Sequence, residues 1–196
     1  YKFAAATVCP PITGVSPISN FKININTQCF VANEFLFENT TNTGGTIQSD
    51  APITYFWDLG DGSTTTEMNP TNNYTVAGAY TVTLTATNKY GTDSKSVQLN
   101  VLPVLEPIVT VATVSTTAGK VTRSFTIDNA ASFTSFSWTL PNKGSGLFQN
   151  INSITEEFSD AGQYTVSVTA INNDCTTIKD ITVTVSSDEV SGGNGG

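Results

Sequence analysis

Three acidic residues lie where the sequence could build a cation site. Asp58 and Asp61 belong to one short polar turn, and Glu67 follows six residues later. Carboxylate oxygens, together with backbone carbonyls, are the ligands that calcium prefers. The spacing lacks the regular series of acids found in an EF-hand loop. The sequence therefore favours a hydrogen-bonded turn, with a calcium site as the alternative and no other cofactor indicated.

Catalytic groups are scarce in this chain. There is no histidine, so the commonest general base and most Ser and Cys triads are absent. Glu156 and Glu157 are adjacent, and neighbours on a strand point to opposite faces, so they cannot share a substrate. Gly60-Asp61-Gly62 lacks the lysine and the following helix of a phosphate-binding loop. We expect that the chain is not an enzyme.

The three cysteines are Cys9, Cys29 and Cys175. Cys9 and Cys29 are near enough in sequence to close a short loop, and Cys175 lies in a polar stretch that indicates an accessible turn. An odd number leaves one thiol after any single internal bridge. That thiol either bridges to another chain or a neighbouring domain, or is a free or incidentally bridged cysteine. Without histidine or a short Cys spacing, a zinc site is not expected.

The composition narrows the partners and the location. The net charge is −8, which disfavours nucleic acid and anionic lipid surfaces. No apolar run approaches the roughly 18 residues that span a membrane, so no membrane insertion is expected. Charged residues make up only 12%, and Thr, Ser, Asn and Val replace them. This composition is typical of a β-rich protein outside the cell or on its surface.

An internal repeat decides the architecture. The segment Ala77–Asn88 recurs as Ala161–Asn172, 84 residues later. Within Tyr80–Ala86, apolar residues alternate with threonines, which predicts a strand with one buried and one wet face. No stretch shows sustained helical spacing. The sequence therefore predicts an all-β chain of two tandem antiparallel β-sandwiches.

The domain boundaries follow from the repeat and from the prolines around it. Pro103 and Pro107 bracket a short, stiff connector. The segment Phe21–Ile25 alternates like a strand but has no counterpart before the second copy. It either packs on the first sandwich as an extra edge strand, or pairs with a neighbouring subunit. The expected segments are an N-terminal extension (1–26), the first sandwich (27–102), the linker (103–108), the second sandwich (109–186) and a Gly/Ser-rich flexible tail (187–196).

The first copy resembles the polycystic kidney disease (PKD) repeat over about Cys29 to Val101. The residues that carry the resemblance are Trp57-Asp58-Leu59-Gly60-Asp61-Gly62-Ser63, Asn69-Pro70, Tyr74 and Gly78-Ala79-Tyr80-Thr81-Val82-Thr83-Leu84. The second copy, about Val109 to Val185, is a degenerate relative in which Thr139–Lys143 replaces the acidic turn. The resemblance implies two immunoglobulin-like, PKD-type antiparallel β-sandwiches.

Each residue type in this motif has an expected structural role. Gly60 and Gly62 permit the positive φ angles of a tight turn, and the Asp58 and Asp61 carboxylates accept hydrogen bonds from nearby backbone N–H groups. A buried tryptophan fills the space between the sheets, and a corner tyrosine bonds back to the backbone. The residues expected to be structural in the two copies are Trp57, Gly60, Gly62, Tyr80, Trp138 and Tyr164.

The resemblance implies extracellular modules used for adhesion, spacing or carbohydrate association. Such modules occur in surface proteins and in secreted proteases, chitinases and related hydrolases. The Thr/Asn-rich phrasing is similar to versions in large surface and secreted proteins of bacteria, particularly the Bacteroidota. We expect an extracellular structural or adhesive segment, which is either a rod-like spacer or a subunit of a cell-surface or filamentous assembly. Its expected partners are copies of itself or neighbouring domains of a longer chain.

Two alternatives remain open at this point. The chain could be an accessory polysaccharide-binding module of a secreted hydrolase, for which the candidate outward aromatics are Phe56, Tyr90, Phe136 and Phe148. It could also be a calcium-stiffened adhesion module, for which the acidic turn would supply the ligands.

Overall fold

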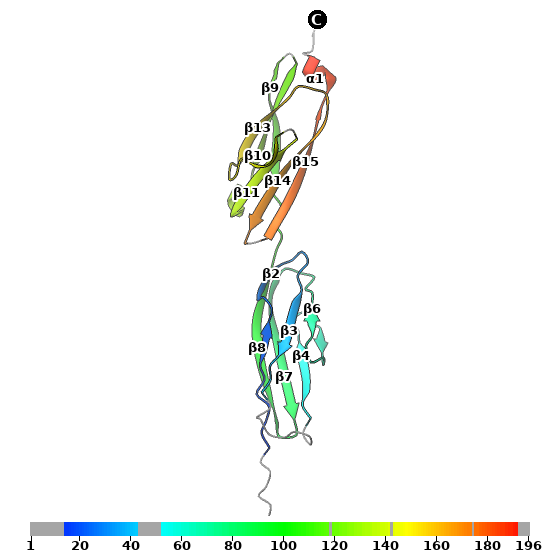
Figure 1. Cartoon of the computed structure of the whole chain (residues 1–196), viewed down its shortest axis with the longest axis vertical. Coiled ribbons are helices and arrows are strands. Elements are labelled where there is room, and N and C mark those ends of the chain that lie inside the picture. The colour runs from blue at the N-terminus through cyan, green and yellow to red at the C-terminus, as the bar shows by residue number, and fades with distance from the viewer. Residues whose placement is uncertain (1–13, 43–51, 118, 142, 174, 192–196) are drawn as a thin grey trace, which may run out of the picture. The chain divides into compact units, whose positions relative to one another are not determined.

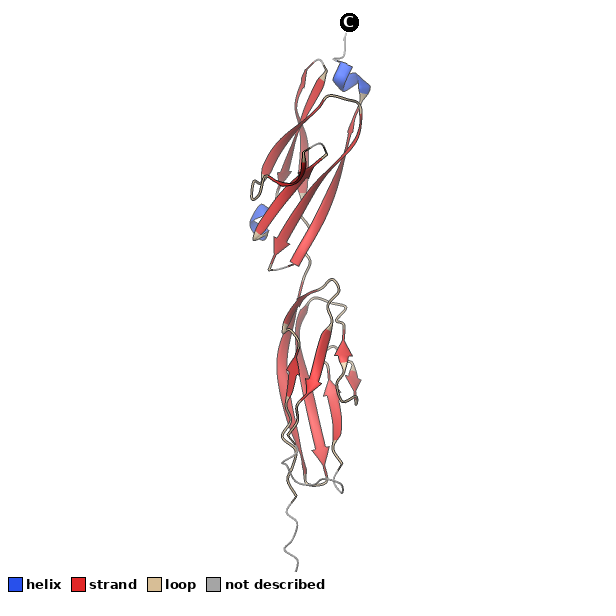
Figure 2. Ribbon diagram, viewed as in Figure 1, coloured by secondary structure: helices blue, strands red, loops and turns tan. Residues whose placement is uncertain are grey.

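The computed structural model describes residues 14–42, 52–117, 119–141, 143–173 and 175–191. The chain divides into two compact units, Tyr1–Val101 and Leu102–Gly196. Nearly all regular structure is β-strand (Figure 2), which confirms the all-β prediction. In the described part of the chain, no helix has the length and apolar character needed to cross a membrane.

The first unit is a sandwich of two sheets, with strand orders β1-β3-β6 and β2-β8-β7-β4-β5 (Figure 1). Its strands are β1 (Phe21–Ile23), β2 (Thr27–Cys29), β3 (Phe35–Asn39), β4 (Thr54–Asp58), β5 (Thr64–Thr65), β6 (Thr71–Asn72), β7 (Gly78–Asn88) and β8 (Gly91–Leu102).

The second unit repeats this plan, with strand orders β13-β10-β9 and β12-β11-β14-β15. Its strands are β9 (Val109–Thr117), β10 (Lys120–Ile127), β11 (Ser135–Leu140), β12 (Gly144–Leu147), β13 (Ser153–Phe158), β14 (Gly162–Asn172) and β15 (Cys175–Val185). A 3-10 turn, Ala130–Ser132, follows β10, and a short helix α1, Ser187–Ser191, follows β15.

The sequence repeat corresponds to one long hairpin that is built twice. In β7, Val82, Leu84 and Ala86 are buried while the threonines between them are half exposed, as the alternation predicts. The register of β7 with β8 runs from Gly78 opposite Val101 to the turn at Asn88. The hairpin β14–β15 pairs in the same register, 84 residues later. The central strand of each unit is therefore fixed by local pattern.

Each unit has its own apolar core centred on one tryptophan. The first core consists of Phe21, Phe35, Phe37, Trp57, Leu59, Tyr74, Val82, Leu84, Leu99 and Val101. The second consists of Val121, Phe125, Ile127, Phe136, Trp138, Leu140, Ile154, Phe158, Val166, Val168, Ala170, Val183 and Val185. Because both cores are complete within one unit, each unit has the packing of a separate domain.

Part of the expected N-terminal extension is integral to the first sandwich. β1 pairs with β3, and Phe21 is only 5% exposed in the core. After Asn24 the chain crosses to the other sheet, where β2 lies beside β8 and Asn100 donates its N–H to the Asn26 carbonyl at 2.8 Å. The expected strand at Tyr1–Ala4 lies outside the described residues. In the described part of the extension, the chain is an extra edge strand packed on its own sandwich.

Residues 187–191 differ from the expected flexible tail, because they form helix α1. Ser186 and Glu189 make a capping box: the Glu189 carboxylate accepts the Ser186 N–H at 2.9 Å, and the Ser186 hydroxyl accepts the Glu189 N–H at 3.3 Å. Arg123 of β10 holds Glu189 at 2.5 Å, and Gly119 donates its N–H to the Val190 carbonyl at 2.7 Å. These contacts offset the weak helical tendency of so short a segment.

Candidate functional site

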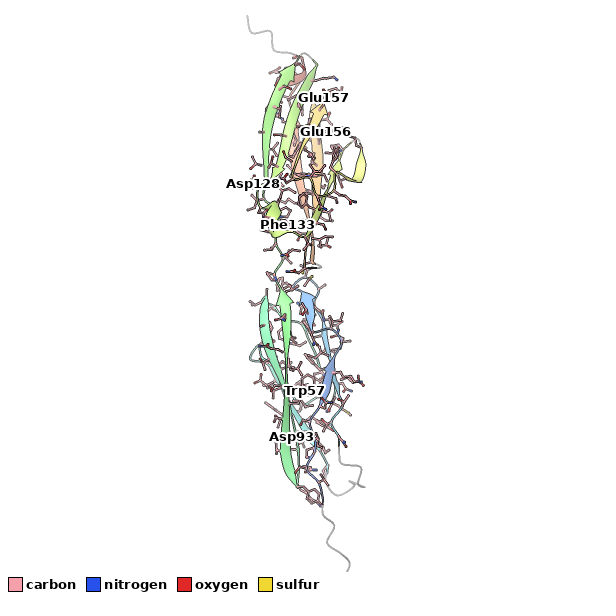
Figure 3. The ribbon with its side chains drawn as sticks, turned by 90° about the vertical axis from the view of Figure 1, so that its left-hand side faces the viewer. Trp57, Asp93, Asp128, Phe133, Glu156 and Glu157 are labelled. Atoms are coloured by element: carbon pink, nitrogen blue, oxygen red, sulfur yellow. The ribbon has the colours of Figure 1, made fainter. Side chains whose placement is uncertain are left out.

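The acidic turn of the first unit begins at a fully buried tryptophan. Trp57, labelled in Figure 3, ends the inward-facing part of β4 and packs edge-on against Phe21, with ring centroids 5.0 Å apart. Its indole N–H donates to the Glu67 carbonyl at 2.9 Å, so the one polar atom of the ring is satisfied. This bond ties the chain after the turn back to the core.

The two turn carboxylates accept hydrogen bonds from their own loop. Asp58 accepts the Gly60 N–H at 2.9 Å. One oxygen of Asp61 accepts the N–H of Ser63 at 2.9 Å and its hydroxyl at 2.5 Å, and the other accepts the Asn72 amide at 2.8 Å. Partial burial opposes ionisation of Asp61, but the bonds from Ser63 and Asn72 outweigh it and hold the pKa of that carboxyl below its usual value.

The glycines of the turn have unequal roles. Gly60 and Gly62 both adopt positive φ angles, +82° and +91°. A Cβ at Gly60 would lie 2.6 Å from the Thr81 carbonyl oxygen, whereas a Cβ at Gly62 would meet nothing within 4 Å. Gly60 is therefore required both by the backbone conformation and by close contact with β7, and Gly62 by conformation alone.

The calcium ligand set proposed from the sequence is not assembled. One oxygen of Asp61 accepts hydrogen bonds within the turn and the other accepts one from Asn72 of β6, while Glu67 contributes its backbone N–H to the Thr65 hydroxyl at 3.2 Å. Within the described residues, no three His, Cys, Asp or Glu side chains converge as a metal site would need. Instead, the Asp58 and Asp61 carboxylates accept hydrogen bonds from backbone N–H groups of the same turn.

Tyr74 holds the turn to the core, a role that the sequence did not reveal. It is 2% exposed, and its hydroxyl donates to the Leu59 carbonyl at 2.7 Å. Burial raises the pKa of Tyr74 to about 12. Asn33 clamps its backbone on both sides: the Asn33 amide accepts from Tyr74 N at 2.8 Å and donates to Tyr74 O at 2.9 Å. The aromatic after Asn69-Pro70 in the motif was the available signal for Tyr74; no local signal pointed to Asn33.

The corner tyrosines of both units form the same hydrogen bond. Tyr80 donates its hydroxyl to the Val76 carbonyl at 2.7 Å, and Tyr164 donates to the Asp160 carbonyl at 2.9 Å. In each case the acceptor lies four residues upstream, so the hydroxyl closes the corner before the long strand.

The second unit keeps the tryptophan but builds its turn differently. Trp138 is fully buried, and its indole N–H donates to the Ile151 carbonyl at 2.8 Å. Lys143 forms an ion pair at 2.8 Å with Glu156, whose side chain is only 3% exposed. Glu157, its neighbour on β13 (Figure 3), is 53% exposed and pairs with Lys120. The two glutamates thus point to opposite faces and do not form a catalytic pair.

Two of the three cysteines are disulfide-bonded. Cys29 in β2 and Cys175 at the start of β15 are both disulfide-bonded. Cys175 is 4% exposed, so the expectation of an accessible turn cysteine was wrong, because the hairpin places this residue on the inner side of β15. Cys9 lies outside the described residues.

The outward face of β4, β7 and β8 carries hydroxyl groups in register. The pairs that share hydrogen bonds are Thr83 with Ser96 at 2.8 Å, Thr85 with Ser94 at 2.9 Å and Thr87 with Thr92 at 3.0 Å. Phe56 lies opposite Thr85 on this face and is 48% exposed. We call these residues the hydroxyl face of the first unit.

The other candidate outward aromatics are less consistent with a binding surface. Phe148 is exposed and Tyr90 is half buried. Phe136 is buried, so its expected outward position was wrong. The reason is that Phe136 is two residues from Trp138 on β11 and therefore shares its inward face.

Comparison with known proteins accounts for both units. The model of the PKD domain matches residues 32–103, and that of the PKD-like domain matches residues 103–185. The pre-pro-metalloprotease PrtV of Vibrio cholerae is 35% identical over 77 residues, which is 39% of this chain and 7% of that protein. Collagenase ColA of Bacillus cereus is 40% identical over 62 residues, which is 32% of this chain and 6% of that protein.

The solved structures include the PKD1 domain of the Vibrio cholerae metalloprotease PrtV, at 33% identity and a TM-score of 0.37, covering 45% of this chain and 99% of that one. The chain spans only a small fraction, 6 to 7%, of the curated proteases it matches. The two family matches together extend from residue 32 to residue 185, and the chain therefore belongs to the PKD family, as a PKD domain followed by a PKD-like domain.

Proposed function

We propose that this chain is a non-catalytic structural segment of a secreted or cell-surface protein, which spaces or positions the parts attached to it. The observation that carries the proposal is the use of polar groups in the acidic turn. Asp58 and both oxygens of Asp61 accept hydrogen bonds from the protein itself. A turn whose carboxylates accept hydrogen bonds in this way stabilises the fold around it.

Two further observations support an extracellular, accessory role. PKD domains occur in secreted proteases and collagenases, and the matched stretch is a small part of each relative. The disulfide bonding of Cys29 and Cys175 fits an oxidising compartment outside the cytosol. A segment of this kind contributes length and stability to its parent protein rather than chemistry.

A second candidate function is favoured by the hydroxyl face. Phe56 is exposed on a face whose hydroxyl groups could donate to and accept from sugars, and an aromatic ring can pack on a sugar ring. This surface would suit an accessory module that binds a neutral polysaccharide for an attached hydrolase.

A depletion experiment separates the two candidates. The whole chain is mixed with insoluble chitin, cellulose and collagen, and the protein left in solution is measured. A structural segment stays in solution with all three. Depletion by a polysaccharide that Phe56→Ala abolishes, while Val76→Ala leaves it unchanged, would replace the structural proposal by the polysaccharide-binding one. Val76 is a matched control because it is 65% exposed in the same unit and lies outside strands β4, β7 and β8.

A further inference from the structure

β9 is the longest edge strand in the described residues that carries no charged side chain. It forms the edge of sheet β13-β10-β9 over nine residues, and its sequence is Val-Thr-Val-Ala-Thr-Val-Ser-Thr-Thr. Of the other edge strands, β1, β2, β5, β6 and β12 have four residues or fewer. β15, with 11 residues, and β13, with six, are longer than these five strands, but both are charged. β15 carries Lys179 and Asp180, and β13 carries Glu156 and Glu157. Short length and charge are the usual protections of an edge, and β9 has neither.

The first unit has a different first strand at the corresponding position. There the chain pairs with the β3 segment from the bridge at Ile18 to Asn24, and then crosses to lie beside β8 as β2. In the second unit the first strand stays on β10 from Val109 to Thr117. The first strand of the first unit carries Lys22, whereas β9 carries no charged side chain.

The open part of β9 is the regular stretch Val109–Thr113. A bulge follows, because Thr113 pairs with Arg123 while Ser115 pairs with Thr122, which leaves Val114 as the extra residue. Beyond the bulge, helix α1 contacts the hairpin through Arg123 and Glu189. In a regular antiparallel edge, every second residue directs its N–H and C=O away from the sheet. Val109–Thr113 therefore offers a five-residue template for one more strand.

Exposed apolar surface accompanies these backbone groups. Val111 lies opposite Phe125, which is fully buried, and yet Val111 itself is 38% exposed. A strand added beside β9 would cover Val111 and extend the buried side of the sheet. Isolated exposed valines are ordinary on a surface. Val111, however, lies on a sheet edge, where backbone groups are directed away from the sheet.

The composition of the stretch points to a second copy of the same chain as the partner. A twofold axis through Val111 places Val111 opposite Val111 of the second copy, and Val109 opposite Thr113. Such pairing brings β-branched side chains together and sets no like charges against each other. A closed, isologous contact of this kind also stops at two chains.

We propose that β9 pairs in antiparallel fashion with β9 of a second copy, and joins two three-stranded sheets into one of six strands. The contact is small and each chain carries a net charge of −8, so it forms at high local concentration, such as on a crowded surface. The role as a structural segment does not depend on this contact, and a monomer would retain it.

The test is the mass of the whole chain in solution as a function of concentration. Free thiols are first alkylated without reduction, so that no new intermolecular disulfide forms, and only material that is monomeric in non-reducing denaturing electrophoresis is used. Analytical ultracentrifugation up to about 1 mM, where weak contacts become populated, then reports the mass. The expected result is a mass that rises toward twice that of the monomer. A mass that stays monomeric over this range would overturn the proposal.

Charge substitutions identify the strand. Val111→Lys and Val111→Glu each set like charges directly opposite across the twofold axis, so each alone is expected to remain monomeric. An equal mixture of the two is expected to regain the dimer. Val114→Lys is the matched control, because this exposed valine of the same strand lies beyond the regular stretch. A dimer that persists in both Val111 variants, or disappears only with Val114→Lys, would assign the contact to another surface.

Hydrogen exchange provides a readout that needs no variant. If β9 pairs with its copy, amides within Val109–Thr113 that do not face β10 exchange more slowly as the concentration rises. Amides of β1, the edge strand at the corresponding position of the first unit, serve as the reference. Concentration-independent exchange at β9, in a sample that dimerises, would contradict the assignment.

Discussion

The two units share one hairpin and one tryptophan, and differ in the turn and in the first strand. β7–β8 and β14–β15 pair in the same register, and both Trp57 and Trp138 are buried with their indole N–H on a backbone carbonyl. The first unit then adds an acidic turn, where the second has an ion pair between Lys143 and Glu156. The shared parts form the frame of this fold, and the turn can be rebuilt without losing it.

The two units also differ in the aromatic residue that packs against the corner tyrosine. Tyr74 packs against the corner Tyr80 with ring centroids 4.0 Å apart, and Phe158 packs against the corner Tyr164 at 4.6 Å. Of the two rings that pack on a corner tyrosine, Tyr74 has a hydroxyl and Phe158 has none. The Tyr74 hydroxyl donates to the carbonyl of Leu59 inside the turn. The first unit thus fixes its turn from below with a buried hydrogen bond, and the second does so with an ion pair at its rim.

The largest difference should appear when the first strand is weakened. Phe21→Ala removes a buried ring that contacts Trp57, so we expect the free energy of unfolding of the first unit to fall by about 3 to 5 kcal/mol. The second unit has its own core and should be unaffected. Denaturant unfolding followed by hydrogen exchange resolves the two units. Ile25→Ala, at a site 59% exposed, is the control, and equal losses in both units would show that they unfold as one.

The next largest effect is expected at alkaline pH, which should destabilise the first unit more than the second. The pKa of Tyr74 is raised from 10.0 to about 12, so its contribution to stability is complete below pH 10 and is lost as pH rises toward 12. The loss in the first unit should reach roughly 2 to 3 kcal/mol. Tyr74→Phe should lower stability near neutral pH and remove this alkaline dependence. If the variant keeps the same pH profile, another group is responsible.

The two turn glycines should differ in their tolerance of a side chain. Gly62→Ala introduces only the strain of a positive φ angle, about 1 kcal/mol. Gly60→Ala adds a clash with the Thr81 carbonyl and should cost clearly more. Thermal unfolding of the two variants compares them directly. A cost at Gly62 equal to or above that at Gly60 would mean that contact with β7 does not constrain the turn.

Calcium should have the smallest effect. Because both oxygens of Asp61 already accept hydrogen bonds from the protein, we expect calcium chloride or EGTA to leave the unfolding temperatures of both units unchanged. A ligand that binds only the folded state would raise them. A rise confined to the first unit, and abolished by Asp61→Asn, would instead support the calcium-stiffened adhesion module.

Local patterns in the sequence determined most of the fold. Alternation in Tyr80–Ala86 and its repeat specify the strands and their buried face, because side chains on a strand alternate between two faces. The glycines and aspartates of the acidic turn likewise act within a few residues of their own position. The corner bond of Tyr80 spans only four residues. Interactions of such short range can be recognised without knowing the rest of the molecule.

The tertiary structure decided everything that depends on partners distant in sequence. Asn33 meets Tyr74 across 41 residues, and Phe21 enters the core because its strand pairs with β3. Burial of Cys175 depends likewise on how the sheets pack. Whether the first strand crosses between sheets or stays on one, which leaves β9 as an edge, is a balance of long-range pairings. The alternation of polar and apolar residues is the same in either case, so the sequence alone could not choose between them.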